Sequence, residues 1–450
     1  MNDKFSRLGF ILSIVGAAIG LGNAWKFPYM VGSNGGSAFV LVYLVFAIVV
    51  GLSIFFAEIS MGRLAKTDPV NSFRMLAPSN KRVWGFAGVM MITGIFVASF
   101  YTLIIGWVVK YALNSFFELP ADIQISSAQF GAFISAGAGE QILYFTLAFF
   151  AYFFVLAKGI KGGIESINLL LIPTLFVLIL LMLVFSTTMD GFKKALEFLL
   201  VPDFSKLTAE SIFMALGLAF FTMCVGIGAI VTYSANMNDS TNLFTSSLYV
   251  VALNIIISIA IGLVIFTFVF EFDAQPSQGV GLAFISLPTL FAKLGEIGHF
   301  LCFTFFIALV FAGLTSAVSM VEPFIFFLER EFGLSRLKAI SIVGAVVYVL
   351  GILCALSNVD GFKEGLTFFE RGFFDWLDYI ASNVMLPLGG IVFCVFVGYV
   401  IKREDLEDVF LKYMGRAIFE IWYFLLRFVA PVCVFVVFVV NSGLYDLVMK

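Results

Sequence analysis

The sequence predicts an all-α polytopic membrane protein with about eleven transmembrane helices. Hydrophobic residues make up 61% of its 450 positions and charged residues only 12%. A soluble globular chain carries about 25% charged residues, enough to cover its surface. A spanning helix needs about 20 mostly apolar residues. The segments that meet this requirement are 8–33, 37–62, 84–117, 141–157, 164–187, 210–234, 241–270, 299–328, 338–357, 374–401 and 417–441.

The first segment begins like a signal peptide, with basic residues before an apolar run. The run is too long for one, however, and continues into polar residues without a convincing cleavage site. We therefore expect it to span the membrane. The longest connections between spans, residues 118–139, 188–209 and 271–298, all fall on one side. The last of them contains an apolar stretch too short to span, which predicts a re-entrant or surface-lying helix pair kinked at Pro288.

Basic residues predict the orientation of these spans. About sixteen lysines and arginines lie on the side of the N-terminus, against about seven on the opposite side. Because Lys and Arg are enriched in cytoplasmic loops, the N-terminus is expected in the cytoplasm. The odd number of spans then places the C-terminus outside.

Composition excludes several classes of function. A net charge of −3 does not suit a nucleic-acid binder. The cysteines are dispersed through apolar runs, and His299 is the only histidine, so neither a zinc site nor histidine-based catalysis is supported. The sequence also lacks a P-loop, an HExxH motif and a nucleophile–base pair. We therefore expect no enzyme.

A short motif recurs in the first and sixth spans. Each carries Gly-x-Gly in mid-membrane, at Gly20 and Gly22 and again at Gly226 and Gly228. If the helices break there, free amides can meet a carboxylate and free carbonyls can meet a cation. The alternative is that the glycines only let helices pack closely, since Gly16 and Gly20 also form a GxxxG pair.

The two motifs divide the chain into repeats. Each opens a block of five spans, 8–187 and 210–401, within a transporter core of residues 1–400. Residues 402–450 add a loop and the eleventh span. Interrupted spans at matching positions of two halves are typical of secondary transporters.

Polar residues within the spans need an explanation because their insertion is costly. Glu58 either pairs locally with Arg63 or accepts bonds from backbone amides freed at a helix break. Asn254 and Ser258 share one face of the seventh span, where an Asn either bonds a neighbouring helix or serves a site. Oxygen-bearing side chains are also present at Asn23, Thr222, Thr315 and Ser316. Oxygen ligands without excess carboxylate suit a monovalent cation.

These motifs resemble the neurotransmitter:sodium symporter family. The resemblance rests on RLGFILSIVGAAIGLGNAWKFPY, NGGSAFVLVY, AEISMGR, FFTMCVGIGAIVTYS, FAGLTSAVSMVEP and DWLDYIASNVMLPLGG, in order over at least residues 7–400. It implies a LeuT-like 5+5 inverted repeat, with helices 1 and 6 broken mid-membrane around substrate and sodium. It also implies a bacterial cytoplasmic (inner) membrane protein, a lipid bilayer as its surroundings, and no nucleic-acid partner. The oligomeric state stays open, a monomer included.

The resemblance implies two sodium sites. The first would use Ala18, Asn23, Thr222 and Asn254, and the second would use Gly16, Ile19, Ala312, Thr315 and Ser316. The substrate site would comprise Ala18, Gly20, Leu21, Gly22, Val97, Tyr101, Phe221, Thr222, Cys224, Ile227, Ala317 and Met320. Glycine at position 20, where the family's monoamine carriers have aspartate, implies an amino acid. The apolar pocket then excludes a charged side chain and favours a neutral, hydrophobic one.

Two gates and an anion site follow from the same resemblance. The outer gate would consist of Lys26, Asp378, Tyr101 and Phe221, and lysine in place of the family's arginine predicts a looser latch. Arg330 stands where the family usually has the inner aspartate. Which residue latches the inner side is therefore undecided, and Glu329, Glu331 and Asp3 are the candidates. Chloride is possible at Tyr43, Thr222, Asn254 and Ser258, although the family's glutamine position holds Leu218.

The predicted function is sodium-coupled symport of a neutral amino acid into the cell by alternating access. Two alternatives stay open: a proton-coupled amino-acid carrier of the same fold and a non-transporting amino-acid sensor. A channel would need a continuous polar row along several spans, and here the polar residues cluster at one depth.

Overall fold

The computed structural model describes residues 4–275 and 281–442. It is a bundle of helices with one two-stranded hairpin among the described residues, β1 (Thr367–Phe368) and β2 (Arg371–Gly372). Nine helices in this part of the chain are long and apolar enough to cross a membrane. The prediction of an all-α polytopic fold is confirmed.

The first five-helix repeat opens with a bent pair. α1 (Arg7–Ala18) and α2 (Phe27–Ser33) together are long and apolar enough to cross a membrane, and the chain bends by 48° between them. The unbroken spans of this repeat are α3 (Ser37–Phe46) with α4 (Leu52–Ala65), α6 (Lys81–Ala87) with α7 (Ile92–Asn114), α9 (Ala138–Ala157) and α10 (Ser166–Ser186). The connections contain α5 (Pro69–Leu76), α8 (Ile123–Ala136) and α11 (Gly191–Leu200).

The second repeat opens with a split helix. α12 (Ala209–Thr222) and α13 (Ala229–Ala235) are separated by residues 223–228, so neither half spans alone. The other spans are α14 (Leu243–Glu271), α16 (Glu296–Phe332), α17 (Arg336–Leu356) and α19 (Phe373–Asp378) with α20 (Leu386–Val395). Outside the repeat spans lie α15 (Leu287–Ala292), α18 (Asp360–Lys363), α21 (Arg403–Phe410), α22 (Arg416–Phe424) and α23 (Ala430–Asn441).

Single π or 3-10 turns join several of these helices. The π turns are η1 (Gly22–Lys26), η2 (Ala47–Gly51), η4 (Ile160–Glu165), η6 (Leu282–Ser286), η8 (Tyr379–Met385), η9 (Phe396–Val400) and η10 (Leu425–Val429). The 3-10 turns are η3 (Gly88–Met91), η5 (Phe204–Lys206) and η7 (Glu364–Leu366). π turns inside α-helices often mark functional sites, and η1 directly follows the first helix break.

Side-chain caps begin several helices where the sequence supplies them. The Ser6 hydroxyl accepts from the Gly9 amide at the start of α1, and Asn242 does the same for Thr245 at the start of α14. Such caps satisfy amides that the helix itself cannot. Pro28 sits in the first turn of α2, where its missing N–H costs nothing.

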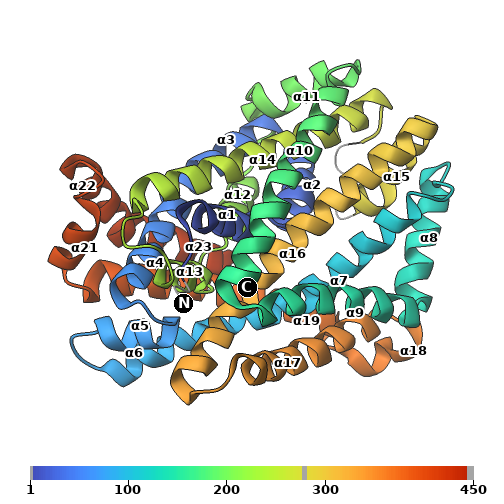
Figure 1. The fold of residues 1–450 in the computed structure, drawn as a ribbon. Helices are drawn as coiled ribbons and strands as arrows, with labels where there is room; N and C mark the ends of the chain where they lie inside the picture. Colours follow the sequence, from blue (N-terminus) through green and yellow to red (C-terminus); the bar gives the residue numbers. More distant parts are fainter. Residues whose placement is uncertain (1–3, 276–280, 443–450) are drawn as a thin grey trace.

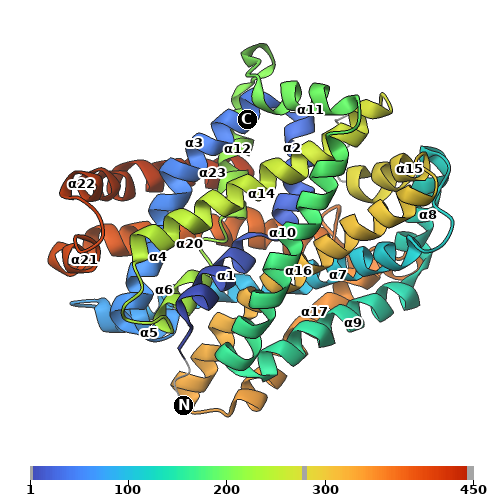
Figure 2. The same ribbon diagram turned by 45° about the horizontal axis from the view of Figure 1, so that its top comes forward.

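The two broken helices lie inside the bundle. α1 contacts α10, α13, α14 and α16, and Figure 2 shows α1 between α14 and α16 near the centre. α9 and α17 pack together against α7 on one side, whereas α21 to α23 lie on the opposite side (Figures 1 and 2). The breaks are thus surrounded by protein, which is where free backbone groups are tolerated in a membrane.

The connection 271–298, predicted to form a re-entrant or surface-lying helix pair, contains one helix instead of two in its described part. The described part of that connection forms one short helix, Leu282–Ala292, with Pro288 in the first turn of α15 rather than at a kink between two helices. Phe284 is buried and stacks on Phe130 of α8 with ring centroids 5.5 Å apart. The segment packs onto the protein because its apolar residues find aromatic partners there.

The bundle has two ends, which we name by their elements. The inner end is where α1 begins, where α9 and α16 end, and where α5 and α21 lie. The outer end carries α8, α11 and α15. Successive spans run in opposite directions between these two ends.

Candidate substrate and sodium site

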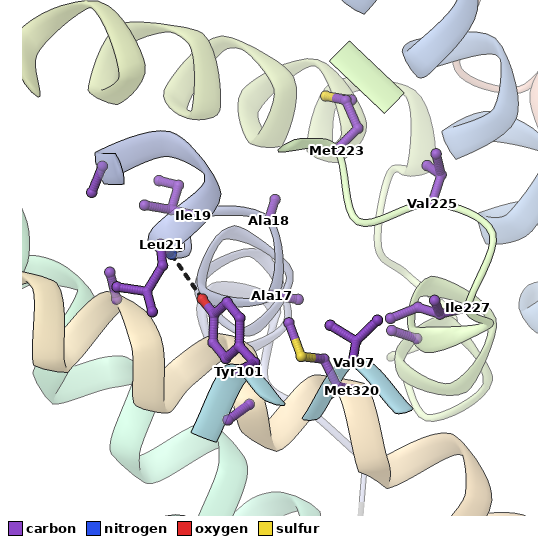
Figure 3. Close-up of a cluster of buried hydrophobic side chains, with 14 of the residues drawn as sticks. Ala17, Ala18, Ile19, Leu21, Val97, Tyr101, Met223, Val225, Ile227 and Met320 are labelled. Carbon is purple, nitrogen blue, oxygen red and sulfur yellow. Dashed lines mark hydrogen bonds between the residues drawn. The ribbon is translucent and has the colours of Figure 1, made fainter. Parts of the chain in front are cut away.

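The first helix break leaves backbone groups beside a tyrosine. α1 ends at Ala18, and the Ile19 amide makes a last helical bond to the Val15 carbonyl at 2.7 Å. The Leu21 amide instead donates to the Tyr101 hydroxyl at 2.7 Å (Figure 3). Since a helix end has amides and carbonyls without intrahelical partners, α7 supplies one of the missing partners here.

The second break is held by left-handed backbone and a buried carboxylate. Cys224, Gly226 and Gly228 have φ angles of 54°, 93° and 77°, a region that glycine adopts at little cost. The Gly226 amide donates to Oε1 of Glu58 at 2.6 Å. Glu58 therefore contacts the break, as the second of its two interpretations requires.

Buried amides and hydroxyls from both repeats meet beside the first break. Nδ2 of Asn23 donates to Oδ1 of Asn254 at 2.6 Å and to Oγ of Ser258 at 2.7 Å. Oδ1 of Asn23 accepts from the Gly20 amide at 3.2 Å. All three side chains are fully buried, so this cluster ties η1 to α14.

A second polar pair lies next to this cluster. The hydroxyls of Tyr43 and Thr222 are 3.1 Å apart, and the Tyr43 hydroxyl also approaches Ser258. Thr222 and Ala18 line one cavity together with Asn23. The structure thus gathers the first sodium set and the chloride candidates, with Asn254 joined through Asn23 rather than lining the cavity.

The second sodium set gathers where α1 ends against α16. The Ser316 hydroxyl faces carbonyl oxygens of Gly16, Ala17 and Ile19 at 2.9, 3.2 and 3.3 Å. Thr315 faces the same region and bonds carbonyls of its own helix, that of Ala312 at 3.1 Å. The donor set is oxygen only, which fits a hard monovalent cation.

An orphaned oxygen lies beside this set. Oδ1 of Asn168, on α10, is buried and has no hydrogen-bond partner among the described residues. A Cβ added at Gly16 would lie 2.1 Å from that oxygen. The orphan is thus an additional oxygen facing the end of α1, as a cation in this cradle would require.

A narrow cavity of about 40 Å³ occupies the space between the two breaks. Its walls are Ala17, Ala18, Gly20, Gly22, Asn23, Val97, Tyr101, Phe221, Thr222, Cys224, Ile227, Ser316, Met320 and Leu386. Figure 3 shows Val97, Tyr101 and Met320 gathered beside the end of α1. Of the predicted substrate residues, Leu21 joins through its amide, and Ala317 is buried outside the wall.

Gly20 has no room for a side chain. A Cβ there would lie 2.4 Å from the Tyr101 hydroxyl oxygen and 2.6 Å from Oγ of Ser316. Both distances are shorter than real Cβ contacts, so any larger residue would have to displace the Tyr101 or Ser316 side chain. The chain instead presents backbone and two hydroxyls at this point.

The outer gate residues lie above the cavity, but they do not pair as predicted. Nζ of Lys26 lies 4.2 Å from the centroid of the Phe221 ring, a cation–π contact. Oδ1 of Asp378 accepts from the Ser382 hydroxyl at 2.7 Å. Within the described residues Lys26 and Asp378 form no ion pair, because each has another partner close by.

At the inner end, an ion pair forms the latch whose residues could not be identified from the sequence. Arg336, at the start of α17, binds both oxygens of Glu322 at 2.7 and 2.8 Å and one oxygen of Glu329 at 3.1 Å. Its Nε donates to the Leu156 carbonyl at 3.0 Å. Glu322 is fully buried, so the latch is a buried, bidentate ion pair that joins α16, α17 and the end of α9.

Of the proposed latch residues, Glu329 thus joins the latch, whereas Glu331 pairs elsewhere, with Arg74 at 2.7 Å. Asp3 lies outside the described residues. Arg330, in the usual place of the aspartate, lies over the Phe326 ring at 5.1 Å. The latch therefore uses a different acid, eight residues earlier in α16 and about two turns deeper.

A second inner contact gathers three cations on one carboxylate. Asp239, in the loop before α14, pairs with Lys4 at 3.2 Å, Arg63 at 3.4 Å and Lys66 at 3.0 Å. Hydrogen bonds from Lys66 and then Lys4 hold the Asp239 pKa below its ordinary value. The Ser6 amide also donates to Glu165, at 3.2 Å.

Sequence reasoning missed Asn168, Glu322 and Arg336. Asn168 and Glu322 are polar residues inside predicted spans, and the cost of burying them was a usable signal. Their partners come from other helices, so the sequence could not identify them. Leu386, in the wall of the cavity, carried no signal, since an apolar residue in an apolar span is ordinary.

The fold and site define a class of protein: a membrane carrier of LeuT-like fold with an oxygen-lined site at two broken helices. Residues 2–127 and 134–448 match the Sodium:neurotransmitter symporter family. The chain belongs to this family. It is therefore a sodium-dependent transporter and not an enzyme.

Named relatives agree with this assignment. The chain is 36% identical to an uncharacterized sodium-dependent transporter, YhdH, of Bacillus subtilis over 98% of this chain and 97% of the relative. It is 31% identical to an uncharacterized sodium-dependent transporter of Haemophilus influenzae, covering 97% of each chain. Among solved structures, MhsT in complex with L-phenylalanine superposes with a TM-score of 0.87 at 36% identity, over 97% of this chain and 98% of that one.

Proposed function

We propose that this protein imports a neutral, hydrophobic amino acid together with sodium by alternating access. The observation that carries the proposal is the position of Gly20 between the Tyr101 hydroxyl and Ser316. Backbone amides and hydroxyls at this break suit the carboxylate of an amino acid. An amine carrier would need its own carboxylate there, and no side chain fits.

The rest of the cavity supports an uncharged side chain. Val97, Ile227, Met320 and Leu386 are apolar, and no acid or base lines the cavity among the described residues. A charged substrate side chain would lose its hydration without gaining a partner. L-Phenylalanine in the related MhsT is a ligand of this kind.

The cavity is too narrow in this conformation for such a ligand, with a volume of about 40 Å³. Binding therefore requires movement of side chains in its wall. Met320 is a flexible candidate, and Phe221 is only half-buried. Movement of Phe221 would also displace the Lys26 ammonium that rests on its ring.

Sodium is the proposed co-substrate at two places. Asn23, Thr222, Asn254 and the Ala18 carbonyl would hold one ion next to the substrate carboxylate, whose charge it would balance. The carbonyls of Gly16, Ile19 and Ala312 with the hydroxyls of Thr315 and Ser316 would hold the other, and Asn168 adds an oxygen there. Influx of sodium would then drive uptake of the amino acid.

Chloride is a second proposed ligand, because no acid stands beside the first sodium set. Tyr43, Thr222 and Ser258 present hydroxyls in one buried cluster, and the Asn254 amide lies among them. Substituting Ser258→Glu would supply a fixed negative charge. We expect this variant to lose any chloride requirement, and a requirement that survives would contradict the assignment.

The inner end is proposed to face the cytoplasm and the outer end the outside of the cell. Basic loops accumulate at the inner end, as the positive-inside rule expects. One helix bundle would then rock around the fixed site between the two repeats, 8–187 and 210–401. We expect the buried Glu322–Arg336 ion pair to help hold the inner side closed.

Thermal stability of the purified protein tests the proposal. Amino acids would be compared in sodium chloride, sodium gluconate and choline chloride, since a ligand of the folded state raises the apparent unfolding temperature. We expect a shift with hydrophobic amino acids in both sodium salts, larger with chloride, and none in choline. A shift of equal size in choline would instead indicate a proton-coupled carrier, and binding without uptake into vesicles would indicate a sensor.

Gly20→Ala is the matching variant. Overpacking against Tyr101 and Ser316 should lower amino-acid affinity about tenfold to a hundredfold. Gly217→Ala, on α12, is the control because its nearest neighbour would be 3.4 Å away. Equal affinity in the two variants would contradict a carboxylate site at Gly20.

A further inference from the structure

A cavity of about 560 Å³ opens at the inner end, separate from the substrate site. Its walls come from the loop between α9 and α10, from the end of α16 and from the start of α17. It is far larger than the cavity between the broken helices, and the transport cycle proposed above leaves it unused.

The charges around this cavity are mostly positive. Lys158, Lys161, Arg330 and Arg336 line it, and Glu329 is the only acid in its wall. Glu329 is already bound to Arg336 at 3.1 Å. The other three cations form no ion pair with any residue that the structure describes, so the cavity has an excess of positive charge.

Aromatic rings hold two of these cations in place. Nζ of Lys158 lies 4.3 Å from the centroid of the Phe154 ring, and the Arg330 guanidinium lies 5.1 Å from that of Phe326. Cation–π contacts leave the N–H groups free to bind an anion. Charged heads that are held next to a cavity lose less entropy when a ligand arrives.

The floor of the cavity offers backbone as well. The loop Lys158–Gly159–Ile160–Lys161–Gly162 leads into η4 and the 21-residue helix α10. A Cβ at Gly159 or Gly162 would meet nothing within 4 Å, so a ligand can approach the main chain closely. Amides at the start of a helix favour a phosphate group.

The rim of the cavity is apolar on its membrane side. Phe154 is 63% exposed and Leu337, the residue after Arg336, is 66% exposed. Both lie at the ends of membrane spans. A ligand with a phosphate head and hydrocarbon chains would bury these surfaces, whereas a free anion would leave them exposed.

We propose that this cavity binds the phosphate headgroup of an acidic phospholipid at the inner membrane surface. Basic pockets between transmembrane helices at that surface are suited to such headgroups. Because Arg336 belongs to both the cavity and the inner latch, the bound headgroup would also stabilise the closed inner end. The site is separate from the transport function, and it rests on that function only for the orientation of the inner end.

Binding is tested with the full chain in nanodiscs. Native mass spectrometry would count retained phosphatidylglycerol or cardiolipin, and thermal unfolding would be compared between these discs and pure phosphatidylcholine discs. The test variant is Lys158→Gln with Lys161→Gln, which leaves the latch intact. The matched control is Lys81→Gln with Arg82→Gln, two exposed cations at the same end that do not line this cavity.

We expect the test variant to lose about thirtyfold in affinity for acidic lipid, about fivefold for each lysine, whereas the control keeps it. Its stabilisation by acidic lipid should disappear, with the sodium-dependent shift retained as proof of folding. Equal retention of lipid by both variants would overturn the proposal. The lipid source is tested by adding inorganic phosphate to phosphatidylcholine discs. If phosphate raises the unfolding temperature as much as acidic lipid does, and only when the two lysines are present, the ligand is a free phosphate and not a lipid. Loss of the sodium shift in unmodified protein would count against the proposed function alone.

Discussion

The two ends of the molecule are held by different interactions, ion pairs at the inner end and a cation–π contact at the outer end. At the inner end, the buried carboxylate of Glu322 receives a bidentate guanidinium. Asp239 gathers three cations there, Lys4 from the N-terminal segment and Arg63 and Lys66 from the end of α4. At the outer end, Lys26 rests on the Phe221 ring and leaves Asp378 to Ser382. A cavity of about 340 Å³ also opens above the lid, next to Lys26 and Phe221.

The difference indicates which side opens more easily. Breaking a buried ion pair by removing one partner costs about 3–5 kcal/mol, whereas the half-buried cation–π contact of Lys26 with Phe221 is worth about 0.5–2 kcal/mol. The conformation is therefore closed firmly inside and lightly outside. A carrier waiting for substrate from outside requires this asymmetry.

The largest expected effect comes from removing the buried acid of the inner latch. Glu322→Ala leaves Arg336 with only the half-buried Glu329 and the Leu156 carbonyl, at a cost of about 3–5 kcal/mol to the closed inner end. Cys224, in the wall of the substrate cavity, reports the opening through its alkylation in inside-out vesicles, followed by mass spectrometry. We expect much faster labelling than in the unmodified protein.

Glu331→Ala is the control for that experiment. The Arg74–Glu331 pair joins the same end but is exposed, with 38% and 29% of its side chains accessible. Such pairs contribute about 0–1 kcal/mol. Equal labelling of the two variants would show that the Glu322 pair does not close the inner side.

The next effect concerns the lid between the two ends. Tyr101→Phe removes the partner of the buried Leu21 amide, at a cost of about 1–3 kcal/mol, or about tenfold to a hundredfold in amino-acid affinity. Isothermal titration measures it. Tyr152→Phe is the control, because that buried hydroxyl bonds Thr102 on α7 away from the cavity. Similar losses in both would mean that the tyrosine acts through packing of α7.

A smaller effect is expected from strengthening the closure of the outer end. Lys26→Arg supplies a planar fork that can reach a carboxylate with two bonds. We expect Cys224 labelling from the outside to slow by about fivefold or less. The slowing should vanish when Asp378→Asn is added. If it persists, the arginine acts through the Phe221 ring instead.

The smallest effect is a pH dependence confined to the inner end. Since the Asp239 pKa is held below its ordinary value, its contribution to closure is complete above that value and is lost as the pH falls through the lowered pKa. Because alkylation needs the thiolate, labelling of Cys224 from the inside is expressed relative to that of the unfolded chain at the same pH, and this ratio should rise below a pH of roughly 4.

Two variants isolate that dependence. Asp239→Asn should remove the rise, because no charge is left to titrate. Asp203→Asn should not, although the pKa of Asp203 is also lowered, because its partners Ser205 and Lys206 belong to the same outer loop. A rise that is unchanged in the Asp239 variant would place the titrating group elsewhere.

Several features of the fold were predictable from particular residues. Within the described residues, nine of the eleven apolar segments correspond to spanning helices and the first to the bent pair, whereas the sixth is split into α12 and α13. The breaks fall next to Gly20 and at Gly226–Gly228, as the paired motifs indicated. The apolar segment around Pro288 was recognised as too short to span. Its docking on Phe130 was not predictable, because it depends on which aromatic ring lies opposite.

The candidate site divides in the same way. Glycines at the breaks and oxygen-bearing side chains within spans could be recognised, since each is costly or unusual in a membrane. The contacts of Asn168 with α1 and of Glu322 with Arg336 could not, since they join helices whose spacing in the sequence carries no information. The predicted partnership of Lys26 and Asp378 likewise depended on distances that only the packing sets.

The sequence by itself determined the membrane class, the two breaks and the polarity of the residues at them. These features depend on local composition and on the cost of burying polar groups in lipid, which act on each segment separately. Only the tertiary structure decided which acid closes the inner end, which ring holds Lys26 and which oxygens converge on α1. Those choices depend on side chains from distant segments meeting at distances of about 3 Å, where hydrogen bonds and ion pairs form.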